Sequence, residues 1–104
     1  MPQQFDILEN RDAKSRAAYP YLIVLQHNRA DTVATMVAAP LAPLNIQLSA
    51  SRLHPSVAVN GQRYVIFVEQ LAAISRKAAG PVVGSAKTNQ YEITAALDML
   101  FTGI

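Results

Sequence analysis

The most regular hydrophobic pattern in the chain occupies its last sixteen residues, 89–104. Apolar residues there follow the i, i+3, i+4, i+7, i+8 spacing of one helical face: Ile93, Ala96, Leu97, Leu100 and Phe101. Asn89 and Glu92 have the spacing of a capping box, and Gly103 stands where a helix commonly ends. The pattern predicts a helix that leaves apolar residues beside the end of the chain. Most domains fray there, so such an end is either docked or used.

Strand-like patterns precede this helix. Residues 4–9 alternate, with Phe5 and Ile7 on one side and Asp6 and Leu8 on the other, which predicts a half-buried first strand. Residues 21–25 form a short apolar run rich in β-branched side chains, typical of a strand covered on both faces. A polar turn over 26–32 leads into another strand over 33–39, and together these segments predict a meander.

A β-hairpin is the strongest local prediction. Asn60 and Gly61 separate two β-rich runs, 57–59 and 62–68, and both residue types tolerate the positive φ of a type I′ turn. In that register Val57 lies opposite Tyr64 and Ala58 lies opposite Arg63.

Proline and glycine interrupt the remaining segments. Proline cannot donate to a sheet ladder, so the segment from Pro40 to Leu44 is expected to leave the main sheet, and Ile46 and Leu48 to return as a short edge strand. Residues 71–74 suit one helical turn or a short strand, and 76–84 are expected to be a loop. The sum is one domain, 1–104, with several antiparallel strands in a barrel-like arrangement and one C-terminal helix.

Composition narrows the functional classes. The chain has no Cys, a net charge of +2 and a pI of about 9.2. This charge excess is too weak to argue for nucleic-acid binding. The first residues lack the pattern of a signal peptide, and no apolar run has bilayer length, so we expect a cytoplasmic protein without a membrane partner.

Catalytic and cofactor motifs are absent from the sequence. His27 and His54 are far apart, and neither has a carboxylate at a ligand-like spacing, so we predict no metal and no cofactor. His54 precedes Pro55 and is best interpreted as a turn residue. The glycine-rich phosphate loops and the nucleophile elbow of hydrolases are also missing.

The chain resembles the CcdB-type toxins of type II toxin–antitoxin modules. The resemblance runs through almost the whole length and rests on the order and spacing of short pieces rather than on one motif. These are Tyr21, Val24 and Gln26, the turn Asp31-Thr32, Met36-Val37 leading to Pro40-Leu41, Leu53-His54-Pro55, and the closing Ile93, Ala96, Phe101, Gly103 and Ile104.

The resemblance implies an SH3-like barrel with a five-stranded antiparallel sheet, a small second sheet and one C-terminal α-helix, assembled as a homodimer. It implies a toxin that is not an enzyme: it binds the gyrase A subunit and traps the complex in which gyrase has cleaved DNA. An isologous dimer suits a target that is itself two-fold symmetric.

The same resemblance implies the interaction residues. The gyrase-binding set is Asp98, Phe101, Thr102, Gly103 and Ile104, with Arg29 and Ala30, and the dimer interface is Leu100, Phe101, Gly103 and Ile104. Thr102 stands where better-known members have Trp, Asp98 where an Asn is often found, and Arg29-Ala30 where two Ile contribute.

The implied regulatory partner is a CcdA-like antitoxin, whose disordered C-terminal segment folds along the toxin dimer. The residues expected at that surface are Arg11, Lys14, Arg16, Leu44 and Arg52. The three charges of the first loop suit an acidic partner, and they equally suit an ordinary solvated loop.

Two alternatives stay open. The MazF and Kid endoribonuclease toxins share the fold; such a function would need a general base, a general acid and a positive groove, for which Arg63, His54 and Glu69 are the candidates. A CcdB-like relic would dimerise and bind antitoxin without poisoning gyrase.

Overall fold

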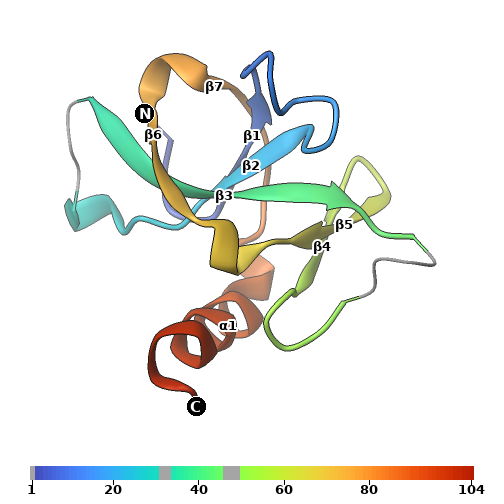
Figure 1. The fold of residues 1–104 in the computed structure, drawn as a ribbon, viewed down its shortest axis with the longest axis vertical. Coiled ribbons are helices and arrows are strands. Elements are labelled where there is room, and N and C mark those ends of the chain that lie inside the picture. The colour runs from blue at the N-terminus through green and yellow to red at the C-terminus, as the bar shows by residue number, and fades with distance from the viewer. Residues whose placement is uncertain (1, 31–33, 46–49) are drawn as a thin grey trace.

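A curled antiparallel sheet with one helix packed across it forms the fold of the computed structural model, which describes residues 2–30, 34–45 and 50–104 (Figure 1). In this part of the chain one sheet holds seven strands in the order β4-β5-β3-β2-β1-β7, and β6 pairs separately with β3. The bounds are β1 Asp6–Asn10, β2 Tyr21–Val24, β3 Thr35–Pro43, β4 Ser56–Val59, β5 Gln62–Ile66, β6 Ala72–Ser75, β7 Ala79–Ser85 and α1 Gln90–Thr102. Short 3₁₀ turns are η1 Asn28–Ala30, η2 Val68–Gln70, η3 Arg76–Ala78 and η4 Lys87–Asn89.

The expected mainly β, barrel-like fold with one C-terminal helix is therefore confirmed, with the sheet curled into a half-barrel. In the described residues the expected small second sheet is not separate, because all seven strands belong to one sheet, in which β3 pairs with β2, β5 and β6. Four expected features lie outside the described residues: the turn Asp31-Thr32, the start of the 33–39 strand, and Ile46 and Leu48 of the edge strand.

Strand β3 contains both Pro40 and Pro43. The prediction that the segment from Pro40 to Leu44 leaves the sheet is therefore wrong. One edge of β3 changes partner at this point, because β6 pairs with it up to Ala38 and β5 pairs with it from Leu41. Pro40 falls in that gap, and its carbonyl still accepts a hydrogen bond from the Phe67 amide at 3.0 Å. Pro43 lies beyond Leu41, where the pairing with β2 ends. Each proline therefore occupies a position where a missing N–H breaks no ladder.

The expected loop over 76–84 is also wrong, because most of it is strand β7, paired with β1 at the edge of the sheet. The pairing passes from Asp6 opposite Ser85 to Asn10 opposite Ala79 through two register shifts. Pro81 lies inside the second shift, and bulges on edge strands are where proline is tolerated. The proline and glycine content that suggested a loop thus builds an irregular edge strand.

Gly80 allows the close approach of β7 to β1. A Cβ at Gly80 would lie 2.9 Å from both the Cβ and the carbonyl oxygen of Glu9, whereas the nearest atom to a Cβ at Gly84 is 3.9 Å away. Gly80→Ala is expected to destabilise the domain by about 1–3 kcal/mol, because the backbone of β1 must move. Urea unfolding followed by circular dichroism measures this change. Gly84→Ala is the matched control, and equal midpoints for the two variants would contradict the close contact.

The hairpin is confirmed in the predicted register, with Val57 opposite Tyr64 and Ala58 opposite Arg63. Asn60 has φ 52° and Gly61 has φ 81°, as a type I′ turn requires. The second strand is shorter than predicted and ends at Ile66, before the turn η2. Residues 71–74, for which a helical turn and a short strand were both open, fall mostly in strand β6, Ala72–Ser75.

Buried side chains lie on both faces of the central strands. Ile7, Ile23 and Leu41 face the main core, which also receives the helix. Leu8, Val24 and Met36 form a second cluster on the opposite face, so Leu8 is buried where the alternating pattern predicted exposure. The curl of the sheet brings β6 and β7 around this second cluster, since Ile74 and Ala79 pack against it (Figure 1).

Two tyrosines close the hairpin side of the main core. The rings of Tyr21 and Tyr64 meet edge to face, with centroids 5.1 Å apart. Burial, with a smaller effect from Tyr21, raises the pKa of the Tyr64 hydroxyl above its ordinary value.

The helix begins after Asn89 and ends at Gly103 as predicted, but its first turn is capped differently. Gly103 is left-handed, with φ 76°, and its amide donates to the Met99 carbonyl. The predicted capping box is wrong, because the Asn89 side chain makes no cap bond and its amide already donates to the Ala86 carbonyl. The chain enters the helix through η4, where the Ser85 hydroxyl accepts a hydrogen bond from the Lys87 amide at 3.2 Å.

Among the described residues, the helices are too short or too polar for any of them to cross a membrane.

Candidate functional site

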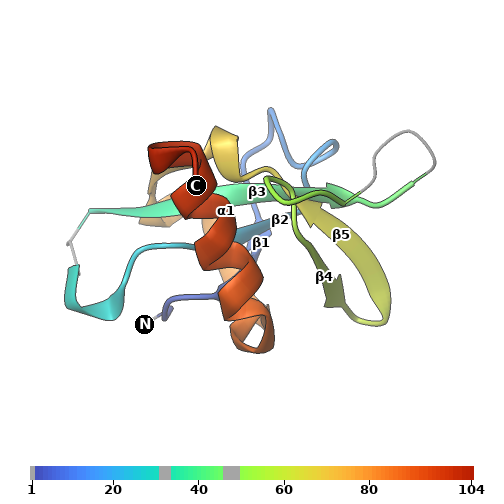
Figure 2. The ribbon, with the colours of Figure 1, turned by 90° about the horizontal axis from the view of Figure 1, so that it is seen from below.

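The exposed end of α1 is the candidate interaction site. The helix is fixed to the sheet at Ile93 and Ala96, whose side chains are both 0% exposed. Two turns further on, the side chains of Phe101 and Ile104 are 69% and 80% exposed. Figure 2 shows the helix crossing one face of the sheet, and Figure 1 places its C-terminal end at the edge of the molecule, away from the strands. A rigidly anchored helix therefore presents bulky apolar groups to solvent.

Local contacts fix the shape of this end. The Thr102 hydroxyl donates to the Asp98 carbonyl at 2.7 Å, so the hydroxyl is used within the helix. Gly103 then turns the chain in the left-handed conformation, which costs a glycine little. Arg52, from the segment before β4, donates from Nη2 to the main-chain oxygen of Ile104 at 2.5 Å.

The predicted dimer residues fall into two environments. Leu100 is half-buried and packs against the main core, so part of its surface is already used within the chain. Phe101, Gly103 and Ile104 are exposed. The sequence pattern missed two further exposed apolar residues on the helix, Tyr91 and Met99, because they lie off the predicted stripe.

Arg29 and Ala30, the other part of the predicted gyrase-binding set, lie on η1. Both are exposed, and Figures 1 and 2 place η1 well to one side of the end of α1 within the chain. The predicted set is thus divided between two surfaces of a single subunit.

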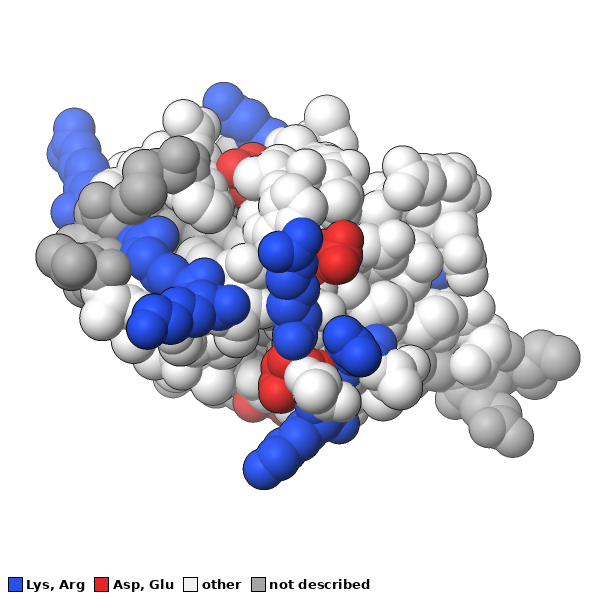
Figure 3. Space-filling model, turned by 90° about the horizontal axis from the view of Figure 1, so that it is seen from above, with Lys and Arg blue, Asp and Glu red and all other residues white. Residues whose placement is uncertain are grey.

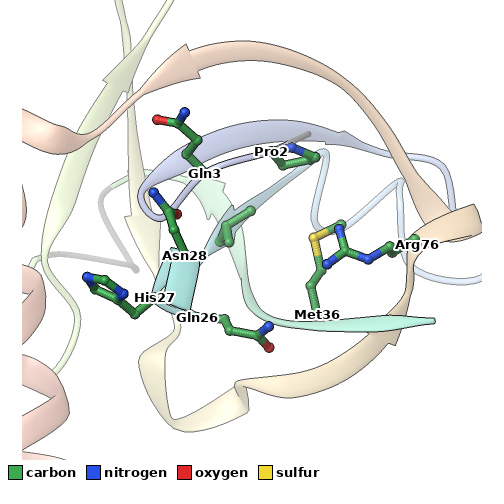
Figure 4. Close-up of a pocket in the computed structure, with 8 residues that line it drawn as sticks. Pro2, Gln3, Gln26, His27, Asn28, Met36 and Arg76 are labelled. Carbon is green, nitrogen blue, oxygen red and sulfur yellow. The ribbon is translucent and has the colours of Figure 1, made fainter. Parts of the chain in front are cut away.

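Polar contacts hold η1 in place. The Gln26 side chain donates to the Ala30 carbonyl and accepts from the Val37 amide, and the Asn28 side chain accepts from the Gln4 amide at 2.9 Å. A cavity of about 190 Å³ lies beside this turn, and Figure 4 shows Gln26, His27 and Asn28 on one side of it and Met36 and Arg76 on the other.

The predicted antitoxin surface contains an ordered charged loop. Asn10 is only 4% exposed, and its side chain donates to the Ser15 hydroxyl and the Tyr19 carbonyl and accepts from the Asp12 amide. These bonds fold residues 11–18 into tight turns, and Arg11, Lys14 and Arg16 all point into solvent-exposed positions. Asn10 therefore anchors the loop from a buried position.

Basic side chains gather near this loop. The Arg11 amide donates to the Ala78 carbonyl, which brings the loop against η3 with its Arg76 and Lys77. Figure 3 shows Lys and Arg side chains across this side of the molecule, with Asp and Glu between some of them. The other two predicted antitoxin residues, Leu44 and Arg52, are exposed and lie on either side of a segment outside the described residues.

A histidine and a carboxylate meet at another place. His54 Nε2 lies 2.8 Å from Glu69 Oε1, although no short sequence spacing linked them. The His54 ring packs on Phe67 with centroids 5.2 Å apart, and Phe67 in turn meets Tyr19 edge to face. Arg63, the third residue considered with them, donates to the Ser56 hydroxyl on the neighbouring strand. In the described residues no three His, Asp or Glu side chains gather as metal ligands would.

Comparison with known proteins gives a family and a fold. The model of the CcdB protein family matches residues 4–103. No curated protein sequence gives a significant match. The solved structure of an endoribonuclease in complex with its cognate antitoxin, from Mycobacterial species, is similar with a TM-score of 0.73 and 15% identity, over 96% of this chain and 94% of that one.

The two comparisons carry different weight. At 15% identity the structural similarity shows a shared fold. The family match spans nearly the whole chain and confirms the resemblance that the sequence pieces indicated. This chain belongs to the CcdB protein family, a family of toxins from toxin–antitoxin modules.

Proposed function

We propose that this toxin binds the gyrase A subunit, traps the complex in which gyrase has cleaved DNA, and acts by binding without catalysing a reaction. The observation that carries the proposal is the exposed end of α1. Phe101 and Ile104 are largely exposed on a helix that the fully buried Ile93 and Ala96 anchor to the sheet. Apolar anchors that fill a partner's pocket supply most of the energy of a typical interface, so their exposure favours a binding role.

A homodimer completes this proposal. Two copies of α1 side by side at a two-fold axis would present Phe101, Gly103 and Ile104 twice, to a two-fold symmetric target. Pairing would remove part of the exposed surface of Phe101 and Ile104 from water.

The dimer predicts the mass of the protein in solution. Size-exclusion chromatography with light scattering is expected to give twice the 11.3 kDa mass of one chain. Phe101→Asp is expected to shift the protein towards monomer, because pairing would then bury an unpaired charge. The matched control is Val82→Asp on strand β7, which is also exposed but lies away from the helix. Monomers for the wild-type chain at micromolar concentration would contradict the symmetric arrangement.

An antitoxin is the second proposed partner. The ordered loop 11–18 and the basic turn η3 suit an acidic, extended segment. The similar endoribonuclease was solved in complex with its own antitoxin, so binding of an antitoxin is compatible with this fold. We propose Arg11, Lys14, Arg16, Leu44 and Arg52 as contacts of a CcdA-like antitoxin.

Growth after induction tests the poison directly. The chain is induced in a gyrase-sensitive bacterium and in a strain whose gyrase A subunit resists CcdB-type toxins. Killing of the sensitive strain alone supports gyrase poisoning. Killing of both strains points to another target, and survival of both supports a relic that retains only the fold. Purified gyrase with supercoiled plasmid gives the matching assay, in which a poison accumulates cleaved DNA.

Endoribonuclease activity is the second candidate, favoured by the contact between His54 and Glu69. A His–carboxylate pair can supply a general base and acid for RNA cleavage. Both side chains are partly exposed, at 26% and 35%, so substrate could reach them. Arg63 is engaged with Ser56 on the adjacent hairpin and could lie along a bound phosphate backbone only by leaving that contact.

The two functions predict opposite effects of one substitution. If the toxin is a gyrase poison, His54→Gln is expected to leave killing unchanged and to lower the free energy of unfolding by less than about 1 kcal/mol, because the pair is partly exposed. Killing is scored by colony counts, and RNA cleavage is measured on purified protein with a fluorescent oligonucleotide. If His54→Gln loses both RNA cleavage and killing while its fold is unchanged, the gyrase-poison hypothesis is rejected in favour of endoribonuclease activity.

A further inference from the structure

Residues 51–55, directly before strand β4, form a cleft with α1. Ser51, Arg52 and Pro55 line one side of this cleft, and Glu92 and Ala95 of the helix line the other, around a volume of about 310 Å³. Pro55 is buried and the Ser51 hydroxyl accepts from the His54 amide at 3.1 Å, so the turn that carries Arg52 is held in place.

The end of the helix returns towards this turn. Gly103 is left-handed, which redirects the main chain after the last helical residue. The Ile104 oxygen then accepts a hydrogen bond from Arg52 Nη2 at 2.5 Å. Residues 52 and 104 are otherwise far apart in the sequence, so this contact ties the end of α1 to a separate part of the fold. A guanidinium donor gives a stronger hydrogen bond than a neutral donor does.

We propose that Arg52 is a positioning residue that holds Gly103 and Ile104 in the orientation in which they meet their target. This proposal deepens the gyrase-binding function and rests on it for its biological purpose. Within one chain, the two residues beyond the helix would have few neighbours without this contact, because both are exposed and a Cβ placed at Gly103 meets nothing within 4 Å. Binding would then have to order them, at a loss of conformational entropy.

The role differs from the one expected for Arg52 at the antitoxin surface. The contact leaves the Ile104 side chain free, since it is 80% exposed while its main-chain oxygen is bound. Arg52 thus fixes the backbone and leaves the apolar group available to a partner. This arrangement is what a preorganised binding element requires.

Three variants test the proposal. Arg52→Gln removes the charge and shortens the side chain, Arg52→Lys retains a cation, and Arg63→Gln is the control, because Arg63 contacts Ser56 on the hairpin instead. The first measurement needs no partner: ¹⁵N relaxation order parameters of the Gly103 and Ile104 amides. We expect them to fall in Arg52→Gln, to recover partly in Arg52→Lys and to stay at the wild-type value in Arg63→Gln, with equal melting temperatures.

The second measurement is the affinity for a purified gyrase A fragment by surface plasmon resonance. We expect about a three- to tenfold weaker complex for Arg52→Gln and partial rescue by Arg52→Lys, with no change for Arg63→Gln. Unchanged order parameters in Arg52→Gln would overturn the proposal, and so would an unchanged affinity despite a mobile end. No binding of the wild-type chain would instead overturn the proposed function, while the order parameters would still decide whether Arg52 holds the end of the chain.

Discussion

Deletion of Gly103 and Ile104 is expected to abolish killing, with colony counts of an induced sensitive strain rising by about a hundredfold or more. The physical reason is the loss of an exposed apolar anchor. A buried Ile side chain contributes roughly 1.5–3 kcal/mol, and losing the anchor together with its backbone contacts lowers affinity by a factor of ten to several hundred. The fold should persist, because both residues are exposed and lie outside the core.

The control for this deletion is Tyr91→Ala. Tyr91 is exposed to the same degree as Ile104, on the same helix but at its beginning. The substitution Tyr91→Ala removes a large apolar side chain outside the proposed site, so killing should remain. Full killing by the deletion variant would refute the site and would be expected of an endoribonuclease acting through His54 and Glu69. Loss of killing in both variants would point to the whole helix face instead.

Ile93→Ala is expected to lower the free energy of unfolding by about 2–5 kcal/mol, the largest stability effect predicted for this chain. Ile93 is completely buried between the helix and the sheet, so the substitution leaves a cavity in the main core. Urea unfolding monitored by circular dichroism gives the change. For a small domain, this is a large share of the total stability, so killing should fall as well.

Met99→Ala on the same helix is the matched control, because Met99 is largely outside the core and should change stability by less than about 0.5 kcal/mol. Ile93→Val gives a graded variant with an expected loss of about 0.5–1.5 kcal/mol, should the alanine variant not fold. Equal unfolding midpoints for Ile93→Ala and Met99→Ala would mean that the helix does not pack on the sheet through Ile93.

Features that depend on local sequence were predicted well. The turn at Asn60 and Gly61 and the left-handed end at Gly103 both follow from residues that tolerate positive φ, and both are confirmed. The helix starts after Asn89 as predicted, but the predicted capping box is wrong because it depends on more than local sequence. The pattern of Asn89 and Glu92 is local, but the choice between α and 3₁₀ geometry at η4 depends on how Ser85 and Ala86 leave strand β7.

Features that depend on distant partners were predicted poorly. Pro40 and Pro81 suggested breaks in the sheet. Only the strand pairing shows that each lies at a position where its missing N–H removes no hydrogen bond between strands. The contact of His54 with Glu69 and the contact of Arg52 with Ile104 join segments with no common motif. The residues of the candidate site at the end of α1 came from the family resemblance. The residue pattern alone predicted only a helix that ends on apolar residues.

The pairing of β1 with β7 has a consequence for the order of folding. Asp6 lies opposite Ser85, so one edge of the first strand stays without its partner until most of the chain has been synthesised. Contacts between residues so distant in sequence raise the contact order and slow the formation of a β-sheet. During translation the early strands and the hairpin can pair first, but the helix follows β7 directly and reaches its place last. Under the proposed function, the toxin could bind its target only after β7 has paired and α1 has packed on the sheet, which delays activity relative to synthesis.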